Sequence, residues 1–155
     1  MPISTDSYAS LEEADLYLSE RSGGGDWPDF DEPARISALI TASKLLNRLN
    51  WRGIVENSSQ PLKFPRTGLY KSLDTHQMER IPSGIPSVIK EATVELALHL
   101  ARNPTVQDQL PTPSKLKLDG VLEMVSAAPT PVIPKHVLAL VEPFRHVPGN
   151  HWFPM

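Results

Sequence analysis

Residues 86–103, PSVIKEATVELALHLARN, decide the fold of this chain. Pro86 suits the first turn of a helix, and Pro104 prevents the helix from continuing. The apolar side chains between them cover more than one stripe of such a helix, so we expect it to be covered on two sides at the centre of a bundle. These apolar residues are Val88, Ile89, Ala92, Val94, Leu96, Ala97, Leu98, Leu100 and Ala101.

Two more helices are predicted on the N-terminal side of this central one. Residues 10–21 begin with Ser10 and Glu13, which is the spacing of a capping box. Residues 31–50 begin with Asp31 as the N-cap and Pro33 in the first turn. Apolar and small residues with a 3.6-residue period then predict one core-facing stripe: Ile36, Leu39, Ile40, Ala42, Ser43, Leu45, Leu46 and Leu49.

Residues 51–84 separate the second helix from the central one and show no periodicity. A connection of this length without secondary structure of its own is unusual inside a compact domain. We therefore expect this loop to be functional, or to be held down by something else, such as neighbouring subunits.

The C-terminal third of the chain is rich in proline. Residues 115–125 alternate around Asp119-Gly120, which predicts a β-hairpin. Residues 134–146 predict a last helix that Pro143 shortens or kinks, with Val137, Leu138 and Val141 as its apolar face. The fold class expected is mainly α: a small bundle of about four helices in a domain of residues 1–146, with this hairpin, the long extended loop and a C-terminal arm of residues 147–155.

Charge is unevenly distributed along the sequence. Residues 1–33 carry nine acidic and one basic side chain, a net charge of −8, whereas residues 34–80 carry eight basic and three acidic ones, a net charge of +5. These runs can be ordinary solvated faces. Alternatively, the molecule has an acidic and a basic pole, which allows copies to stack head to tail and close into a ring.

Residue patterns typical of catalysis are missing. The chain has no Cys, which excludes disulfides, thiol nucleophiles and thiolate metal sites. The five histidines form no metal-binding spacing, and neither a nucleophile elbow nor a phosphate-binding loop is present. We expect no catalytic residue, no cofactor and no metal. The N-terminus does not resemble a signal peptide, and no apolar run is long enough to span a membrane.

The basic middle of the chain has the residue types of a surface for single-stranded nucleic acid. Aromatic rings that stack on bases and cations that follow phosphates are the usual ingredients. Six cations spread over 33 residues are a thin footprint, however, and rings beside helix ends are more often packing residues. The residues concerned are Arg48, Trp51, Arg52, Lys63, Phe64, Arg66, Tyr70, Lys71 and Arg80.

Several blocks between residues 7 and 103 occur in a specific order. They are Ser7-Tyr8, LEEADLYL (11–18), WRG (51–53), QPLKFPR (60–66), Ile81-Pro82, Ile85-Pro86 and KEATVELA (90–97). In this order they resemble a family of small proteins encoded among the head and tail morphogenesis genes of tailed phages, often described as "putative DnaT-like single-stranded DNA-binding protein". The same pattern resembles the head–tail connector, or adaptor, proteins of phage necks.

The resemblance implies a helical protomer in a homo-oligomeric ring, usually a dodecamer, located in the virion neck and in the host cytoplasm during assembly. Its partners would be the portal protein and the next neck or tail protein. DNA would be only the genome passing through the channel, with no membrane and no catalysis involved. Single-stranded DNA binding is the alternative function.

Two groups of residues are candidates for contacts in such an assembly. We expect inter-subunit or loop-anchoring packing from Trp51, Phe64, Pro65, Arg66 and Tyr70, with Arg66 pairing with an acidic residue of a neighbour's first helix. The apolar arm after Pro148-Gly149 is expected to dock on a partner such as the portal, or else to fold back on its own domain. Its candidate contact residues are His151, Trp152, Phe153 and Met155.

Overall fold

The computed structural model of the chain describes residues 6–106 and 132–146. In chain order, its elements are α1 (Leu11–Glu20), a 3-10 turn (Trp27–Asp29), α2 (Glu32–Asn47), β1 (Ile54–Val55), β2 (Arg66–Thr67), β3 (Leu69–Lys71), β4 (Met78–Arg80), α3 (Ser87–Arg102), α5 (Lys135–Val141) and a second 3-10 turn (Glu142–Phe144). The protein is therefore mainly α with small antiparallel strand pairs, as the sequence predicts.

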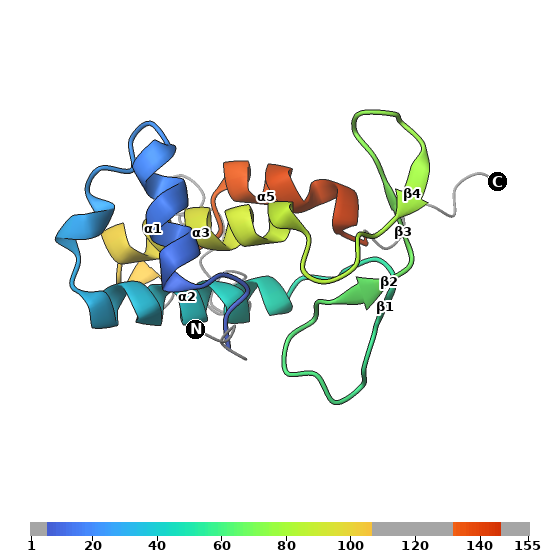
Figure 1. Cartoon of the computed structure of the whole chain (residues 1–155), viewed down its shortest axis with the longest axis horizontal. Coiled ribbons are helices and arrows are strands. Elements are labelled where there is room, and N and C mark those ends of the chain that lie inside the picture. The colour runs from blue at the N-terminus through green and yellow to red at the C-terminus, as the bar shows by residue number, and fades with distance from the viewer. Residues whose placement is uncertain (1–5, 107–131, 147–155) are drawn as a thin grey trace, which may run out of the picture.

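Helix α3 is the centre of the bundle. Helices α1, α2 and α5 all pack against it (Figure 1). Its buried residues include Ile89 and Leu96, which are fully shielded from solvent. The predicted central helix is confirmed, with its first and last residues each one position inside the predicted range.

Helix α1 begins with the predicted capping box. The Glu13 amide donates to the Ser10 hydroxyl, and the Ser10 amide donates to the Glu13 carboxylate, both at 3.1 Å. Ala14 and Leu18 are buried on the face toward the core, whereas Leu16 on the opposite face is 63% exposed.

Helix α2 presents most of the predicted stripe to the core. Leu39, Ala42, Ser43, Leu45 and Leu46 are buried, as predicted, and Ala38 is buried beside them. Ile36, expected in the core, is 40% exposed, because it lies near the N-terminal end of the helix. The helix also ends at Asn47 rather than at Asn50, because the amides of Arg48 and Leu49 bond to carbonyls three residues back.

The last helix is shorter than predicted. Helix α5 ends at Val141, and Pro143 lies in the 3-10 turn that follows. Pro143 lies two residues beyond the end of α5 and has no backbone N–H to donate, which explains the tighter turn. Val137 and Val141 are buried and Leu138 is half-buried, as the predicted apolar face requires.

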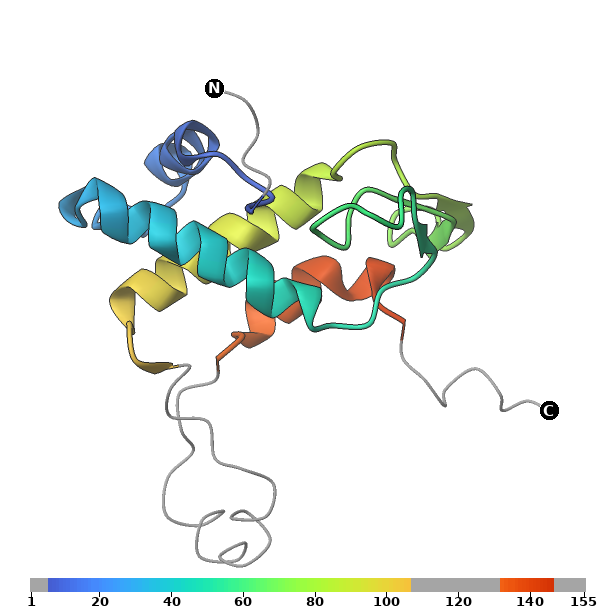
Figure 2. The same cartoon turned by 90° about the horizontal axis from the view of Figure 1, so that it is seen from below.

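Residues 51–84 do form secondary structure, which corrects the expectation of a structureless loop. Strands β1 and β2 pair with Ile54 opposite Thr67, and β3 and β4 pair with Tyr70 opposite Glu79. Strands of two or three residues are too short to show an alternating pattern, so they could not be predicted from the residue pattern. Together the two strand pairs form the end of the molecule far from α1, which we call the hairpin end (Figures 1 and 2).

The hairpin end is attached to the helices of its own chain. The Arg52 amide donates to the Phe144 carbonyl at 2.8 Å, and the His146 amide donates to the Asn50 carbonyl at 2.9 Å. These bonds join the start of the segment to the turn after α5. The segment thus has anchors within one protomer, and ordering by neighbouring subunits stays a prediction.

Two glycines allow the backbone before β1 and the backbone between β2 and β3 to approach each other closely. Gly53 and Gly68 both have positive φ angles, +79° and +140°. A side chain at Gly53 would collide with the Thr67 carbonyl oxygen, and one at Gly68 would approach the Gly53 Cα to 2.7 Å. Only glycine, which has no Cβ, fits where these two backbone segments approach.

Candidate functional site

The aromatic residues of the hairpin end form a core of edge-to-face rings. Trp51 is 7% exposed and Phe64 is 2% exposed, with their ring centroids 5.1 Å apart. The Phe64 ring also meets Tyr8 from the N-terminal segment and Phe144 from the turn after α5. Pro65, joined to Phe64 by a cis peptide bond, is half-buried. Trp51 and Phe64 therefore pack within their own chain, and inter-subunit packing by these residues stays a prediction.

Arg66 organises the backbone around these rings. Its Nε donates to the Arg52 carbonyl at 2.8 Å, and its terminal nitrogens reach the carbonyls of Gly53 at 2.5 Å and Lys63 at 3.3 Å. Burial lowers the pKa of Arg66 from its usual value. The guanidinium is thus bonded to carbonyls of its own chain, and its predicted pairing with a neighbour's carboxylate stays a prediction.

Tyr70 presents at most one ring face to solvent. Its other face stacks on Phe144, with centroids 4.4 Å apart and planes 18° apart. No Trp, Tyr or Phe side chain among residues 6–106 and 132–146 is exposed. Those at the hairpin end are buried, except Tyr70, which is half-buried. Base stacking on this end would depend on Tyr70.

The outward face of the β3–β4 pair mixes apolar and cationic side chains. Alternation along the strands places Leu69, Lys71, Met78 and Arg80 on one face, opposite the face of Tyr70 and Glu79. All four are exposed, with Leu69 at 51% and Met78 at 50%. Neither Lys71 nor Arg80 forms an ion pair within the described residues. We call these four residues the hairpin face.

An apolar groove lies behind this face. It has a volume of about 570 Å³ and runs between the β3–β4 pair and helix α5. Tyr70, Leu73, Val88, Leu140 and Phe144 are among its lining residues. The groove is open and mainly apolar, which suits packing of another chain segment rather than catalysis.

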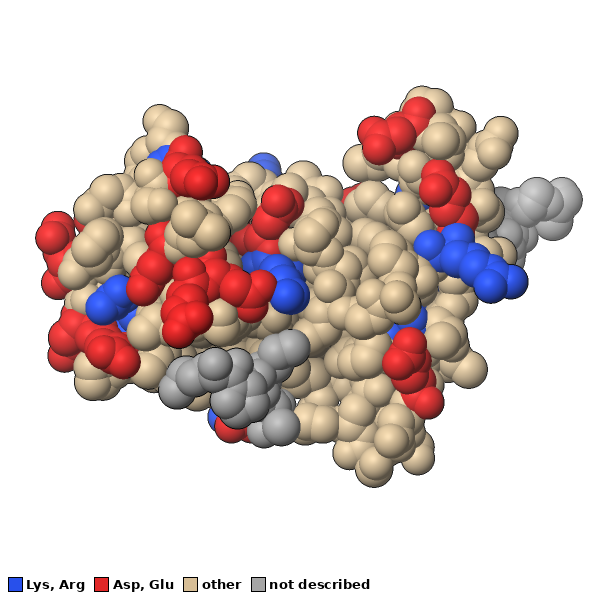
Figure 3. Space-filling model, in the orientation of Figure 1, with Lys and Arg blue, Asp and Glu red and all other residues tan. Residues whose placement is uncertain are grey.

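Acidic side chains gather at the opposite end of the molecule, over α1 and the segment that follows it (Figure 3). Three carboxylates there are paired within the chain: Glu13 with Lys90, Asp15 with Arg35 and Asp26 with Arg102. Five exposed ones form no ion pair within the described residues, namely Glu12, Glu20, Asp29, Asp31 and Glu32. The hairpin end shows both signs of charge in the same view, so the segregation is strongest for the acids.

A second groove borders this acidic end. It has a volume of about 280 Å³ and lies between α1 and the first half of α3. Leu16, Tyr17 and Val94 are its apolar lining residues, and Glu20 and Glu91 are two of its acidic ones. We call it the α1–α3 groove.

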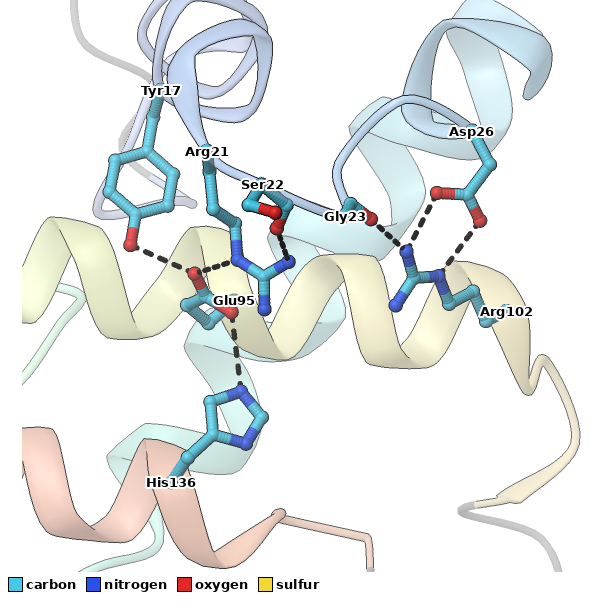
Figure 4. Close-up of polar contacts among 8 residues, drawn as sticks. All are labelled: Tyr17, Arg21, Ser22, Gly23, Asp26, Glu95, Arg102 and His136. Carbon is cyan, nitrogen blue, oxygen red and sulfur yellow. Dashed lines mark hydrogen bonds and ion pairs between the residues drawn. The ribbon is translucent and has the colours of Figure 1, made fainter.

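Glu95 is a buried carboxylate that sequence reasoning missed. It is 5% exposed on α3 and accepts hydrogen bonds from Tyr17 at 2.8 Å and from Arg21 at 2.7 Å (Figure 4). His136 of α5 lies 3.2 Å from its other oxygen. A sequence signal existed: an isolated acid in an apolar helix needs a partner, and Tyr17 and Arg21 share a face of α1.

The partners of Glu95 decide its charge state. Burial would raise the pKa of Glu95, but the hydrogen bonds from Arg21, Tyr17 and His136 outweigh it and lower the pKa below 4.5. Burial and the bond to this carboxylate raise the pKa of Tyr17 to about 12. The ionised Glu95 thus links α1, α3 and α5, which is a structural role.

Other predicted site residues lie outside the described part of the chain. They are the 115–125 hairpin and the arm residues His151, Trp152, Phe153 and Met155. Within residues 6–106 and 132–146, no group of His, Asp and Glu side chains could hold a metal ion. Over the same residues, no helix has the length and apolar character needed to cross a bilayer.

One comparison with known proteins gives a match. The model of the family described as "Putative DnaT-like ssDNA binding protein" matches residues 3–130. No curated protein and no solved structure matches the chain. The matched range includes helices α1 and α3, with the whole α1–α3 groove, and both strand pairs of the hairpin end.

Proposed function

The chain belongs to the family described as "Putative DnaT-like ssDNA binding protein", and from this premise we propose that it is a structural connector, assembling into a ring between the portal and the tail of a bacteriophage. The resemblance of its sequence blocks between residues 7 and 103 to those of phage head–tail connectors supports this proposal. In the virion neck, the ring would bind the portal on one side and the next neck or tail protein on the other, with the genome passing through its channel.

The observation that carries this proposal is the separation of two exposed surfaces. The hairpin face carries exposed apolar side chains and two cations, while the α1 end carries the five exposed carboxylates named above, and none of these charges is in an ion pair with another residue that the structure describes. A protomer whose opposite ends complement each other assembles head to tail, and such a contact closes into a ring when the rotation permits. Exposed apolar patches of this kind commonly mark protein interfaces.

Single-stranded DNA binding is the second candidate, because it is what the family's description names. Exposed Arg48, Lys63, Lys71 and Arg80 could contact phosphates at the hairpin end. Base stacking, however, has only Tyr70 available there within the described residues, and Arg66 is bonded to carbonyls. The geometry of the described residues therefore supports assembly better than base binding.

The two functions can be separated with the purified full-length chain. A connector should form rings visible by negative-stain microscopy, alone or with its portal, and should bind oligo-dT weakly at about 0.15 M salt. A single-strand binding protein should bind oligo-dT tightly, with an affinity that falls steeply as salt rises, and should need no portal. Tight, salt-sensitive DNA binding without rings would overturn the connector proposal.

A further inference from the structure

The hairpin face has a regular arrangement of apolar and charged side chains. In the β3–β4 register, Leu69 lies opposite Arg80 and Lys71 lies opposite Met78. The two apolar side chains therefore lie on one diagonal and the two cations on the other, with Cβ separations of about 7–8 Å along a diagonal. This creates a small apolar patch with a positive charge on either side.

Helix α1 presents the opposite pattern. Glu12, Leu16 and Glu20 follow one another at four-residue intervals on one exposed stripe. Each interval is a rise of about 6 Å, so Leu16 has a carboxylate about one turn away in each direction. Leu16 and Glu20 also line the α1–α3 groove, where Tyr17 and Val94 add apolar surface.

Helix α1 and the β3–β4 pair lie at opposite ends of the molecule (Figure 1), so the hairpin face does not pack on the exposed stripe of α1 in its own protomer. On this basis we propose that the β3–β4 hairpin of one copy docks on the α1–α3 groove of the next. Leu69 and Met78 pack against Leu16, while Lys71 and Arg80 pair with Glu12 and Glu20. The inference rests on the proposed ring and names the contact that would build it.

Charge complementarity identifies a second copy as the occupant. The groove has one cation, Lys90, which is paired with Glu13, and two further carboxylates, Glu20 and Glu91. The hairpin face supplies two cations with no ion pair in the described residues. Paired charges around an apolar contact fix the register of an interface and speed association, and salt weakens them. Because the contact is heterologous, every subunit in a ring uses both surfaces.

Cysteine crosslinking tests this contact directly, since the chain has no Cys of its own. The variants Leu16→Cys and Met78→Cys are mixed, with the portal present, and treated with a short bis-maleimide. The mixture should give a covalent dimer, whereas each variant alone should give none. Ile36→Cys is the matched control, because Ile36 is also an exposed apolar residue but lies on α2 outside both surfaces.

A charge exchange tests the pairing itself. The double variant Lys71→Glu/Arg80→Glu should weaken assembly by about tenfold or more, because like charges then face each other. Combining it with Glu12→Lys/Glu20→Lys in the same chain should restore most of the assembly. Circular dichroism of each variant checks that the helices are intact, and the crosslinking experiment does not depend on these variants folding.

The outcomes separate this inference from the proposed function. Rings without a Leu16–Met78 crosslink above the Ile36 control would overturn the contact and leave the connector proposal standing. Crosslinking of either single variant to itself would also overturn it, because that result requires an isologous contact. Failure of the unmodified chain to assemble, even with its portal, would overturn both.

Discussion

At the α1 end of the protomer, charged side chains hold the helices to one another, whereas at the hairpin end backbone carbonyls and packed rings hold the strands in place. Glu95, Glu13 and Asp26 each connect two elements through an ion pair. Arg66 instead bonds to carbonyls, and Phe64 packs among three other rings. The difference leaves the cations of the hairpin face available for contacts with other molecules.

Replacing Phe64 should cause the largest loss of stability. Phe64→Ala removes the ring that joins Trp51, Tyr8 and Phe144, and the cavity should lower the free energy of unfolding by about 3–5 kcal/mol. Urea denaturation measures this loss. Ile54→Ala, at a 70% exposed position of the same end, should change it by less than about 0.5 kcal/mol. Equal effects of the two variants would show that the rings are not the anchor.

Neutralising Glu95 should have the next largest effect. Glu95→Gln leaves Arg21 without its carboxylate and should lower the free energy of unfolding by about 2 kcal/mol. This loss is smaller than that expected for a fully buried ion pair, because Arg21 is partly exposed. Glu91→Gln, at a half-buried position of the same helix outside the network of Figure 4, is the control and should change little. A comparable loss in both variants would contradict the special role of Glu95.

The contribution of Glu95 should also depend on pH. Its folded-state pKa is lowered below 4.5, so the stabilisation is fully present above that pH and is lost as the pH falls through the folded-state pKa. The difference in melting temperature between the unmodified chain and Glu95→Gln should therefore be constant near neutral pH and shrink below about pH 4.5. A difference that persists unchanged at pH 3 would indicate that packing, not charge, is responsible.

Arg66 and Arg80 provide a smaller contrast within the hairpin end. Arg66→Gln removes hydrogen bonds to several carbonyls and should lower the unfolding free energy by about 1–2 kcal/mol. Arg80→Gln removes an exposed cation and should leave stability unchanged while weakening assembly. If Arg66→Gln impaired assembly but not folding, its predicted contact with a neighbour's carboxylate would be supported instead.

Deleting residues 148–155 should have the smallest effect on folding. If the arm docks on a partner, the truncated chain should keep its unfolding free energy and fail to join portal particles. Denaturation and co-sedimentation with the portal measure the two properties. Unchanged attachment would end the docking hypothesis, and a clear loss of stability would show that the arm folds back on its own domain.

The helices could be predicted because their signals are local. Ser10 with Glu13, the proline at position 86 and the 3.6-residue period of α2 all depend on neighbours within a few positions. The core-facing stripe of α2 was predicted for the most part, but Ile36 is exposed and Ala38 is buried, contrary to the pattern. The outcome depends on the partner helix, which a single periodic pattern does not contain.

The candidate site depended on contacts between distant parts of the chain. Strands β1 to β4 have two or three residues each, and Arg66 gains its role only when the carbonyls of residues 52 and 53 are folded around it. The Glu95 network likewise joins residues 17, 21 and 136 from two other helices. The sequence predicted a functional role for residues 51–66, but only the fold shows whether their side chains face inward or outward.

The close approach of the Gly53 and Gly68 backbones limits which substitutions this protein accepts. Both positions are solvent-exposed, and exposed positions ordinarily accept most substitutions. Here the backbone of one glycine occupies the space that a side chain on the other would need. A library randomised at both positions and selected for folded protein should return glycine at each of them, so two residues that bury nothing belong among the least replaceable of the chain.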